Sequence, residues 1–349
     1  MRCILLVLFI GLGLTACANT SNSNHSLKTV TATFETPVMQ SEGDSADDPA
    51  IYIGSNGGGF IAGTDKQAGL YIYNLDGTLR DFMSVGLVNN VDLRSGFSYR
   101  GQDHVLLVAS DDETSAIVTI LYNPATDQFI TPNNARLATG TVSPYGICLG
   151  KMEDGSFHAG VTTKDGRFVQ YEVSSAGSMH LTKLREIAVG GQAEGCDFDE
   201  RRSVVYLNVE EGALMYFSSK PNDVTSPTEI ANVGQFGVKA DLEGVTTYRV
   251  GQNEGYIIIS SQGNNSFGVF ALPSYAFVGR FIIVDDIVDG VSSTDGIAVT
   301  SKPTPKFPKG FLVVQDDMDN TSTSKLRKKQ NFKVIDWRDI EHQLTQKLE

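Results

Sequence analysis

Alternating apolar and polar residues run along most of the chain from Thr29 to Trp337, and turn-forming pairs interrupt them at short intervals. Strands flank Asp76-Gly77 in "GLYIYNLDGTLRDF", Asp165-Gly166 in "AGVTTKDGRFVQYEV", Glu211-Gly212 in "VVYLNVEEGALMYF" and the turn across Gly263 to Asn265 in "YIIISSQGNNSFGVFAL". Period-two alternation indicates strands with one buried face, and such pairs favour hairpin turns. The pattern predicts an all-β protein.

Comparable strands recur along the chain, each after an acidic or polar turn. They begin near Leu70, Ile117, Arg167, Ala213, Ser266 and Asn331. Their spacing of roughly 46 to 65 residues approaches that of a four-stranded propeller blade. We therefore predict a six-bladed β-propeller with four-stranded antiparallel blades, formed as one domain by residues 29–349. A two-sheet sandwich is the alternative.

The strand predicted in "TVTATFETPV" has no hairpin partner nearby. We expect it to pair with the C-terminal "NFKVIDW" segment and close the ring, because closure removes exposed sheet edges.

Residues 1–17, "MRCILLVLFIGLGLTAC", have the layout of an export signal. The "LTAC" ending resembles a bacterial lipoprotein cleavage box, which would make Cys17 the lipidated first residue of the mature chain. A plain secretory signal cut near "TACA" is the alternative. Residues 18–28 are polar and predict a flexible linker. We expect an exported monomer, either held at a membrane by lipid (periplasmic or cell-surface) or secreted.

The 349 residues carry a formal net charge of −13, which argues against binding to nucleic acid or to an anionic membrane surface. Of the four cysteines, only Cys148 and Cys196 lie beyond the predicted signal. A disulfide between them and two buried free thiols are both open.

Many carboxylates occur at turns or strand entries, in similar places within the repeats. They are Asp47, Asp48, Glu194, Glu210, Glu211, Asp241, Glu243, Asp289, Asp295, Asp316 and Asp317. Equivalent positions of successive blades converge at one end of a propeller's channel. Converging carboxylates need protons or hard cations, and oxygen ligands without histidine or thiol favour Ca²⁺. The alternative is that these acids only end strands and cap turns.

The sequence resembles the β-propeller phytases, calcium-dependent enzymes that remove phosphate from myo-inositol hexakisphosphate (phytate), here in a bacterial lipoprotein form. The matching motifs are "GDSADDPAIYI", "NNVDLR", "TTKDGRFVQYE", "AEGCDFD", "ADLEGVTTY", "GYIIISSQGNNSFGVF", "STDGIAV", "FLVVQD" and "QNFKVIDW". The resemblance implies a 3-phytase-type phosphoric monoester hydrolase that uses several Ca²⁺ ions, binds phytate or other inositol phosphates as calcium complexes, and works by direct attack of calcium-bound water.

By resemblance, the motifs also assign roles to single residues. The calcium ions at the cleavage site would be held by the catalytic residues Asp47, Glu194 and Glu243, with Asp241 and Gln262 beside them. Structural calcium would lie at Glu35, Asp48, Asp289 and Asp316. Further site carboxylates would be Asp295, Glu210 and Glu211. Phosphate would be contacted by Lys66, Tyr145 and Lys164.

One position departs from the family pattern, because Asp112 stands where relatives usually carry an arginine. An aspartate there would repel phosphate unless it gains its own cation. Two rival functions therefore stay open. One is another calcium-dependent propeller hydrolase, acting on lactones or phosphotriesters. The other is a non-catalytic, calcium-stabilised propeller that binds phosphorylated ligands.

Other phosphatase classes lack their motifs. None of the five histidines lies in an "RHGxR"-like stretch. The segment "CDFDERR" from Cys196 to Arg202 has Cys-x5-Arg spacing, but it is acidic and has no glycine to wrap a phosphate.

Overall fold

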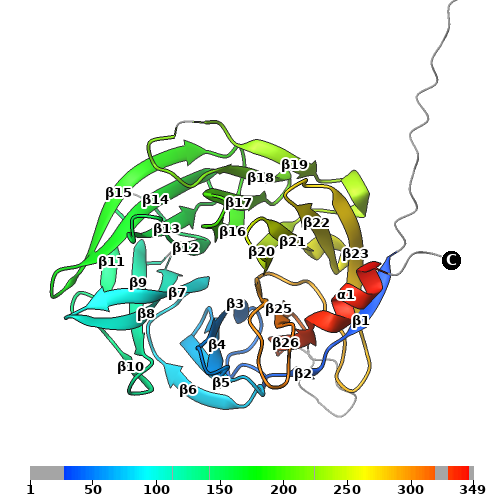
Figure 1. Cartoon of the computed structure of the whole chain (residues 1–349), viewed down its shortest axis with the longest axis horizontal. Helices are drawn as coiled ribbons and strands as arrows, with labels where there is room; N and C mark the ends of the chain where they lie inside the picture. The colour runs from blue at the N-terminus through cyan, green and yellow to red at the C-terminus, as the bar shows by residue number, and fades with distance from the viewer. Residues whose placement is uncertain (1–26, 112, 141, 224, 319–328, 346–349) are drawn as a thin grey trace, which may run out of the picture.

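Six β-sheets surround a central channel like the blades of a propeller (Figure 1). The computed structural model describes residues 27–111, 113–140, 142–223, 225–318 and 329–345. Blade 1 contains β3 (Ala46–Ile53), β4 (Gly59–Asp65), β5 (Gly69–Asn74) and β6 (Leu79–Met83). Blade 2 contains β7 (Val91–Tyr99), β8 (Gln102–Asp111), β9 (Ala116–Asn123) and β10 (Gln128–Ile130), and β11 (Arg136–Ala138) also pairs with β9.

The next blades repeat this antiparallel order. Blade 3 contains β12 (Ile147–Lys151), β13 (Phe157–Thr162), β14 (Arg167–Ser175) and β15 (Met179–Ala188). Blade 4 contains β16 (Ala193–Asp199), β17 (Val204–Val209), β18 (Ala213–Ser218) and β19 (Thr228–Asn232). Blade 5 contains β20 (Leu242–Val250), β21 (Glu254–Ser261), β22 (Ser266–Leu272) and β23 (Phe277–Val284). Two short 3₁₀ turns are η1 (Gln235–Gly237) and η2 (Gln262–Asn264).

The two ends of the described chain meet in blade 6. This blade contains β24 (Ile297–Thr300), β25 (Phe311–Asp316), β26 (Asn331–Asp336) and, as its fourth strand, the N-terminal β2 (Phe34–Glu35). β2 pairs antiparallel with β26, so that Phe34 faces Val334. The predicted ring closure is therefore confirmed.

The six predicted strand starts all correspond to the third strand of a blade, namely β5, β9, β14, β18, β22 and β26. The six-bladed prediction is thus confirmed, and the sandwich is excluded. Apart from β26, these third strands follow short turns, where the chain reverses direction within a few residues, and such turns are visible in the sequence.

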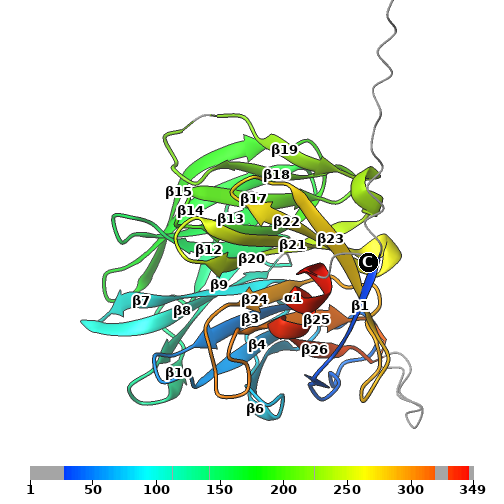
Figure 2. The same ribbon diagram turned by 45° about the vertical axis from the view of Figure 1, so that its right-hand side comes forward.

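Two additions to the propeller were not predicted. β1 (Lys28–Thr31) runs parallel to β23 on the outside of blade 5, and α1 (Trp337–Thr345) lies beside both strands (Figure 2). Trp337 is fully buried and stacks on Tyr248 with 3.7 Å between the ring centroids. These contacts attach both ends of the described chain to the blade 5 and blade 6 side of the ring.

A disulfide joins Cys148 of β12 to Cys196 of β16. It links the first strands of blades 3 and 4, two segments 48 residues apart in sequence. The choice left open by the sequence is therefore settled in favour of the disulfide. Within the described residues, no helix is long and apolar enough to cross a membrane. The predicted signal, including Cys17, lies outside the described residues.

The topology explains why distant acids share one face. In an antiparallel blade, the start of the first strand and the start of the third strand lie at the same edge. Asp47, Glu194 and Glu243 lie near the start of a first strand, whereas Lys66 and Gln262 lie in turns before a third strand. All five positions therefore reach the same end of the channel.

Candidate active site

Three buried glutamates form the centre of the site. Glu194 lies on β16, Glu210 in the turn after β17, and Glu243 on β20. Each offers a carboxylate oxygen, and the three oxygens all lie within 4.8 Å of one another. Burial raises the pKa of Glu243 well above its ordinary value, and the charges of Glu194 and Glu210 raise it further. The cluster is thus strongly strained electrostatically when all three groups are charged.

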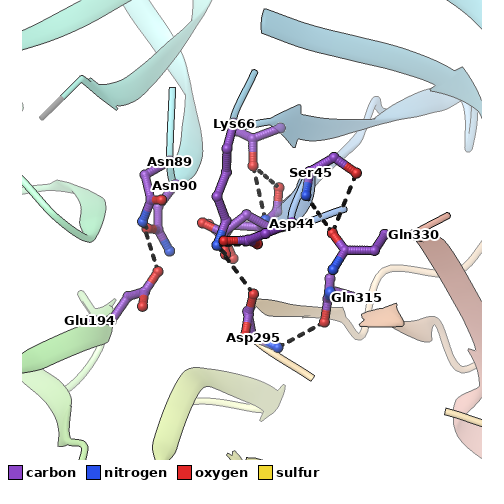
Figure 3. Close-up of polar contacts among 12 residues, drawn as sticks. Asp44, Ser45, Lys66, Asn89, Asn90, Glu194, Asp295, Gln315 and Gln330 are labelled. Atoms are coloured by element: carbon purple, nitrogen blue, oxygen red, sulfur yellow. Dashed lines mark hydrogen bonds and ion pairs between the residues drawn. The ribbon is translucent and has the colours of Figure 1, made fainter. Parts of the chain in front are cut away.

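A second set of acids surrounds Lys66 (Figure 3). The Lys66 ammonium lies 2.9 Å from Asp44, 3.3 Å from Asp47 and 3.4 Å from Asp295. Burial alone would lower the pKa of Lys66, but the charges of Asp47, Asp295 and Glu194 together raise it. Asp47 is fully buried, and burial raises its pKa to about 7 despite the lysine. One ammonium therefore does not neutralise these acids.

Amide groups orient two of the carboxylates. Asn89 Nδ2 donates to Glu194 Oε1 at 2.9 Å (Figure 3). Gln262 Nε2 donates to Asp295 Oδ1 at 2.5 Å. Asn89 was not among the predicted site residues, although the motif "NNVDLR" contains it. Its position could have indicated the site, because Asn89 lies two residues before the first strand of blade 2, close to the strand entries that hold Asp47, Glu194 and Glu243 in other blades.

The predicted phosphate contacts lie near this centre. The Lys164 ammonium lies over the ring of Tyr145, 4.4 Å from its centroid. Burial raises the pKa of Tyr145, and the charge of Glu194 adds to the shift. Tyr145 therefore stays a neutral hydroxyl next to the glutamates, with Lys164 as an exposed cation beside it.

A separate cluster brings together three of the acids assigned by resemblance to structural calcium. Glu35, Asp289 and Asp316 all contact the ammonium of Lys333, a fully buried residue on β26. Burial raises the pKa of Asp316 to about 7, although Lys333 opposes the shift. Sequence reasoning missed Lys333, because in "NFKVID" it reads as an ordinary polar position of a closing strand.

Asp48 lies apart from the cluster at Lys333. Its Oδ2 accepts a hydrogen bond from the backbone N–H of Val91 at 3.0 Å, and it lines the central channel. Asp47 and Asp48 thus reach different neighbours, as expected for adjacent residues of an extended strand. Glu211 is exposed in its turn, and Asp241 is half-buried beside Gln262, whose N–H donates to the Asp241 carbonyl. Asp112 lies outside the described residues.

The donor set fits a hard cation. Both carboxylate oxygens of Asp47 and Oε2 of Glu243 are buried without a hydrogen-bond partner among the described residues, although Oδ1 of Asp47 lies 3.3 Å from the Lys66 ammonium. Leaving such oxygens unpaired is costly, and Ca²⁺ binds clusters of carboxylate and amide oxygens. The arrangement can therefore bind divalent ions and, through them, an anionic substrate.

Comparison with known proteins identifies the family. A family model described as Phytase matches residues 3–349. The chain belongs to the phytase family. A 3-phytase from Bacillus subtilis (strain 168) is 33% identical over 337 residues, which cover 93% of this chain and 87% of that protein. The family predicted from the motifs is thus confirmed.

A solved structure also resembles the fold of this phytase-family chain. Regucalcin, a calcium-binding protein from Agrobacterium tumefaciens str. C58, aligns with a TM-score of 0.53 and 10% identity, over 89% of this chain and 97% of that one. At this identity the likeness shows the propeller fold alone.

Proposed function

We propose that this protein is a calcium-dependent phosphatase that hydrolyses phosphate monoesters of phytate. The observation that carries the proposal is the triad Glu194, Glu210 and Glu243, whose converging buried oxygens need a divalent counter-charge. Membership of the phytase family and likeness to a 3-phytase support the substrate class.

The residues of the site would have different roles in this reaction. Asp47, Glu194, Glu210 and Glu243 would hold the ions, with Asp295 beside them. Bound calcium supplies the positive charge that neutralises phosphate oxygens and makes water a better nucleophile. Lys66 and Lys164 add cationic charge at the edge of the acidic centre, and Asn89 keeps Glu194 oriented. Cys196 is bonded to Cys148, so it cannot serve as a nucleophilic thiolate.

The test is phosphate release from phytate by the holoprotein in calcium. Glu243→Gln keeps the size of the side chain but removes the charge. We expect it to lower kcat/KM at least about a hundredfold, in line with losing one group that stabilises transition-state charge. Glu254→Gln is the matched control, because Glu254 is exposed at the start of β21. Equal activity of the two variants would contradict the proposal.

The same assay separates the rivals. Turnover of a lactone or phosphotriester without release of phosphate from phytate would favour another propeller hydrolase. Saturable phytate binding without any phosphate release would favour a non-catalytic binding protein.

We further propose that the chain is exported, lipidated at Cys17 and monomeric. The order of charged, apolar and small residues before Cys17 supports the first two points. The Cys148–Cys196 disulfide is typical of an oxidising compartment outside the cytoplasm. Mass spectrometry of the mature N-terminus tests lipidation, and Cys17→Ser should move the protein to the soluble fraction. Light scattering tests the oligomeric state.

A further inference from the structure

The central channel contains a cavity of about 260 Å³, whose lining does not include the glutamate triad. Its walls include Arg94 near the middle of β7, Arg249 near the end of β20, and Lys302 after β24. These are later positions on the first strands of blades 2, 5 and 6, whereas the site acids lie at or before the starts of first strands. The cavity therefore extends toward the opposite end of the channel.

Arg94 is almost fully engaged by acids. Its Nε donates to Glu200 at 2.6 Å, and its Nη1 donates to Asp92 at 2.8 Å. Asp197 lies 3.4 Å from its Nη2. These carboxylates hold the guanidinium in one orientation at the wall of the channel.

Arg249 is held less completely. Its Nη2 donates to the Phe198 carbonyl at 2.6 Å, and the nearest carboxylate oxygen, on Glu200, lies 3.4 Å away. Its Nε is buried without a hydrogen-bond partner among the described residues, although it lies 3.8 Å from the Asp199 carboxylate. Glu200 and Asp197 also pair with Arg94. The Arg249 guanidinium therefore has N–H groups that these two carboxylates do not fully satisfy.

Lys302 faces these two arginines without an acid of its own. Its ammonium donates to the carbonyl of Ile53 at 3.2 Å, and it makes no ion pair with any carboxylate in the part of the chain that the structure describes. Burial lowers the pKa of Lys302, and the charges of Arg94 and Arg249 lower it further. Three cations from three blades thus line one cavity, together with the carboxylates of Asp48, Asp92 and Asp197.

We propose that Arg94, Arg249 and Lys302 form a binding site for a small tetrahedral oxyanion of the inorganic phosphate class. Carboxylates already pair with both arginines, so an oxyanion here would chiefly give Lys302 the anionic partner that it lacks. Of the three acids that line the cavity, Asp92 and Asp197 pair with the arginines, and Asp48 accepts a hydrogen bond from the Val91 N–H. The site goes beyond the proposed hydrolysis and does not depend on it.

Selenate is a suitable probe, because it is a tetrahedral dianion with an anomalous X-ray signal. In crystals of the calcium-loaded protein soaked in selenate, we expect a selenium peak between Lys302 and the two arginines. Selenium bound only among the carboxylates near Lys66, or nowhere, would overturn the proposal. Activity on phytate does not enter this test, so its outcome is separate from that of the proposed function.

Variants test the same site in solution. Lys302→Met should weaken selenate binding at this site at least about tenfold by calorimetry, as expected for losing one charged hydrogen bond. Lys306→Met is the matched control, because Lys306 lies in the same loop as Lys302, between β24 and β25, but its ammonium lies over the ring of Phe34 in β2 and does not line the cavity. Equal affinities of the two variants would contradict the proposal.

A measurement of thermal unfolding shows whether Lys302→Met loses selenate binding only because the variant is less stable. Without oxyanion, Lys302→Met should unfold at the wild-type temperature or above it, because a repelled charge has been removed. A lower unfolding temperature would show that Lys302 stabilises the empty channel, and it would also contradict the proposal.

Discussion

Glu243→Gln should stabilise the calcium-free protein, although it removes a predicted calcium ligand. Glu243 is 5% exposed, and its oxygen lies within 4.8 Å of oxygens on Glu194 and Glu210. At that distance, two charges repel by about 3.5 kcal/mol at an effective dielectric constant near 20. Burial raises the pKa of the Glu243 carboxyl well above 4.5, and the charges of Glu194 and Glu210 raise it further, so that retaining a proton relieves the repulsion.

The destabilisation that Glu243 causes in the calcium-free protein at pH 7 therefore cannot exceed the free energy of protonating its carboxylate. A group that ionises near 4.5 when unfolded but stays protonated when folded weakens folding by about 1.4 kcal/mol per pH unit above 4.5. At pH 7 the sum is about 3 kcal/mol. Glutamine has no proton to retain, so Glu243→Gln should raise the calcium-free unfolding free energy by up to about 3 kcal/mol.

Urea unfolding in excess chelator measures this effect, with Glu254→Gln as the exposed control. The stability of the calcium-free wild type should fall as the pH rises from 5 to 7, because the unfolded chain releases protons that the folded site keeps. The slope should be shallower in Glu243→Gln. Lower stability of Glu243→Gln than of the wild type in chelator would refute the reasoning, because it would mean that the carboxylate is satisfied without a cation.

Three further predictions concern the fold. Replacing Cys148 and Cys196 by Ser should lower the unfolding free energy by about 4 kcal/mol, from the closure entropy of a loop spanning 48 positions; equal urea midpoints of the variant and the oxidised wild type would contradict this. Lys333→Met should destabilise the calcium-free protein by about 3 to 5 kcal/mol, because it leaves buried carboxylates unpaired, and added calcium should restore part of the loss; unchanged thermal unfolding in chelator would contradict this. Trp337→Ala should cost about 3 to 5 kcal/mol, because the buried ring packs between blades 5 and 6; a loss below 1 kcal/mol in urea unfolding would show that α1 does not stabilise the ring closure.

The blade pattern was predictable because each blade is marked by short-range sequence features, namely turns and the strands next to them. Most third strands follow a short polar turn, as β14 (Arg167–Ser175) follows residues 163–166; β26 is the exception, because residues 317–330 separate it from β25. β1 was not separated from β2 because both lie in one alternating stretch, and nothing local tells that Lys28–Thr31 pairs with β23 in parallel. The helix α1 is short, and its burial depends on Tyr248, which is distant in sequence.

The acids of the site were predictable by type and position, whereas their grouping was not. Turn and strand-entry positions placed Asp47, Glu194 and Glu243 at one end of the channel, and the structure brings them there. Which acids share a cation depends on side-chain direction across blades. That is why Asp48 points into the channel, while Lys333 from the closing strand enters the group expected around structural calcium.

The most direct test of the account is to follow phosphate release from phytate while free calcium is removed and then restored in one sample. We predict that hydrolysis stops in chelator and returns when calcium is added, because the site's own acids repel the substrate without the ions. Continued release of phosphate by the fully metal-free protein at its original rate would contradict the account.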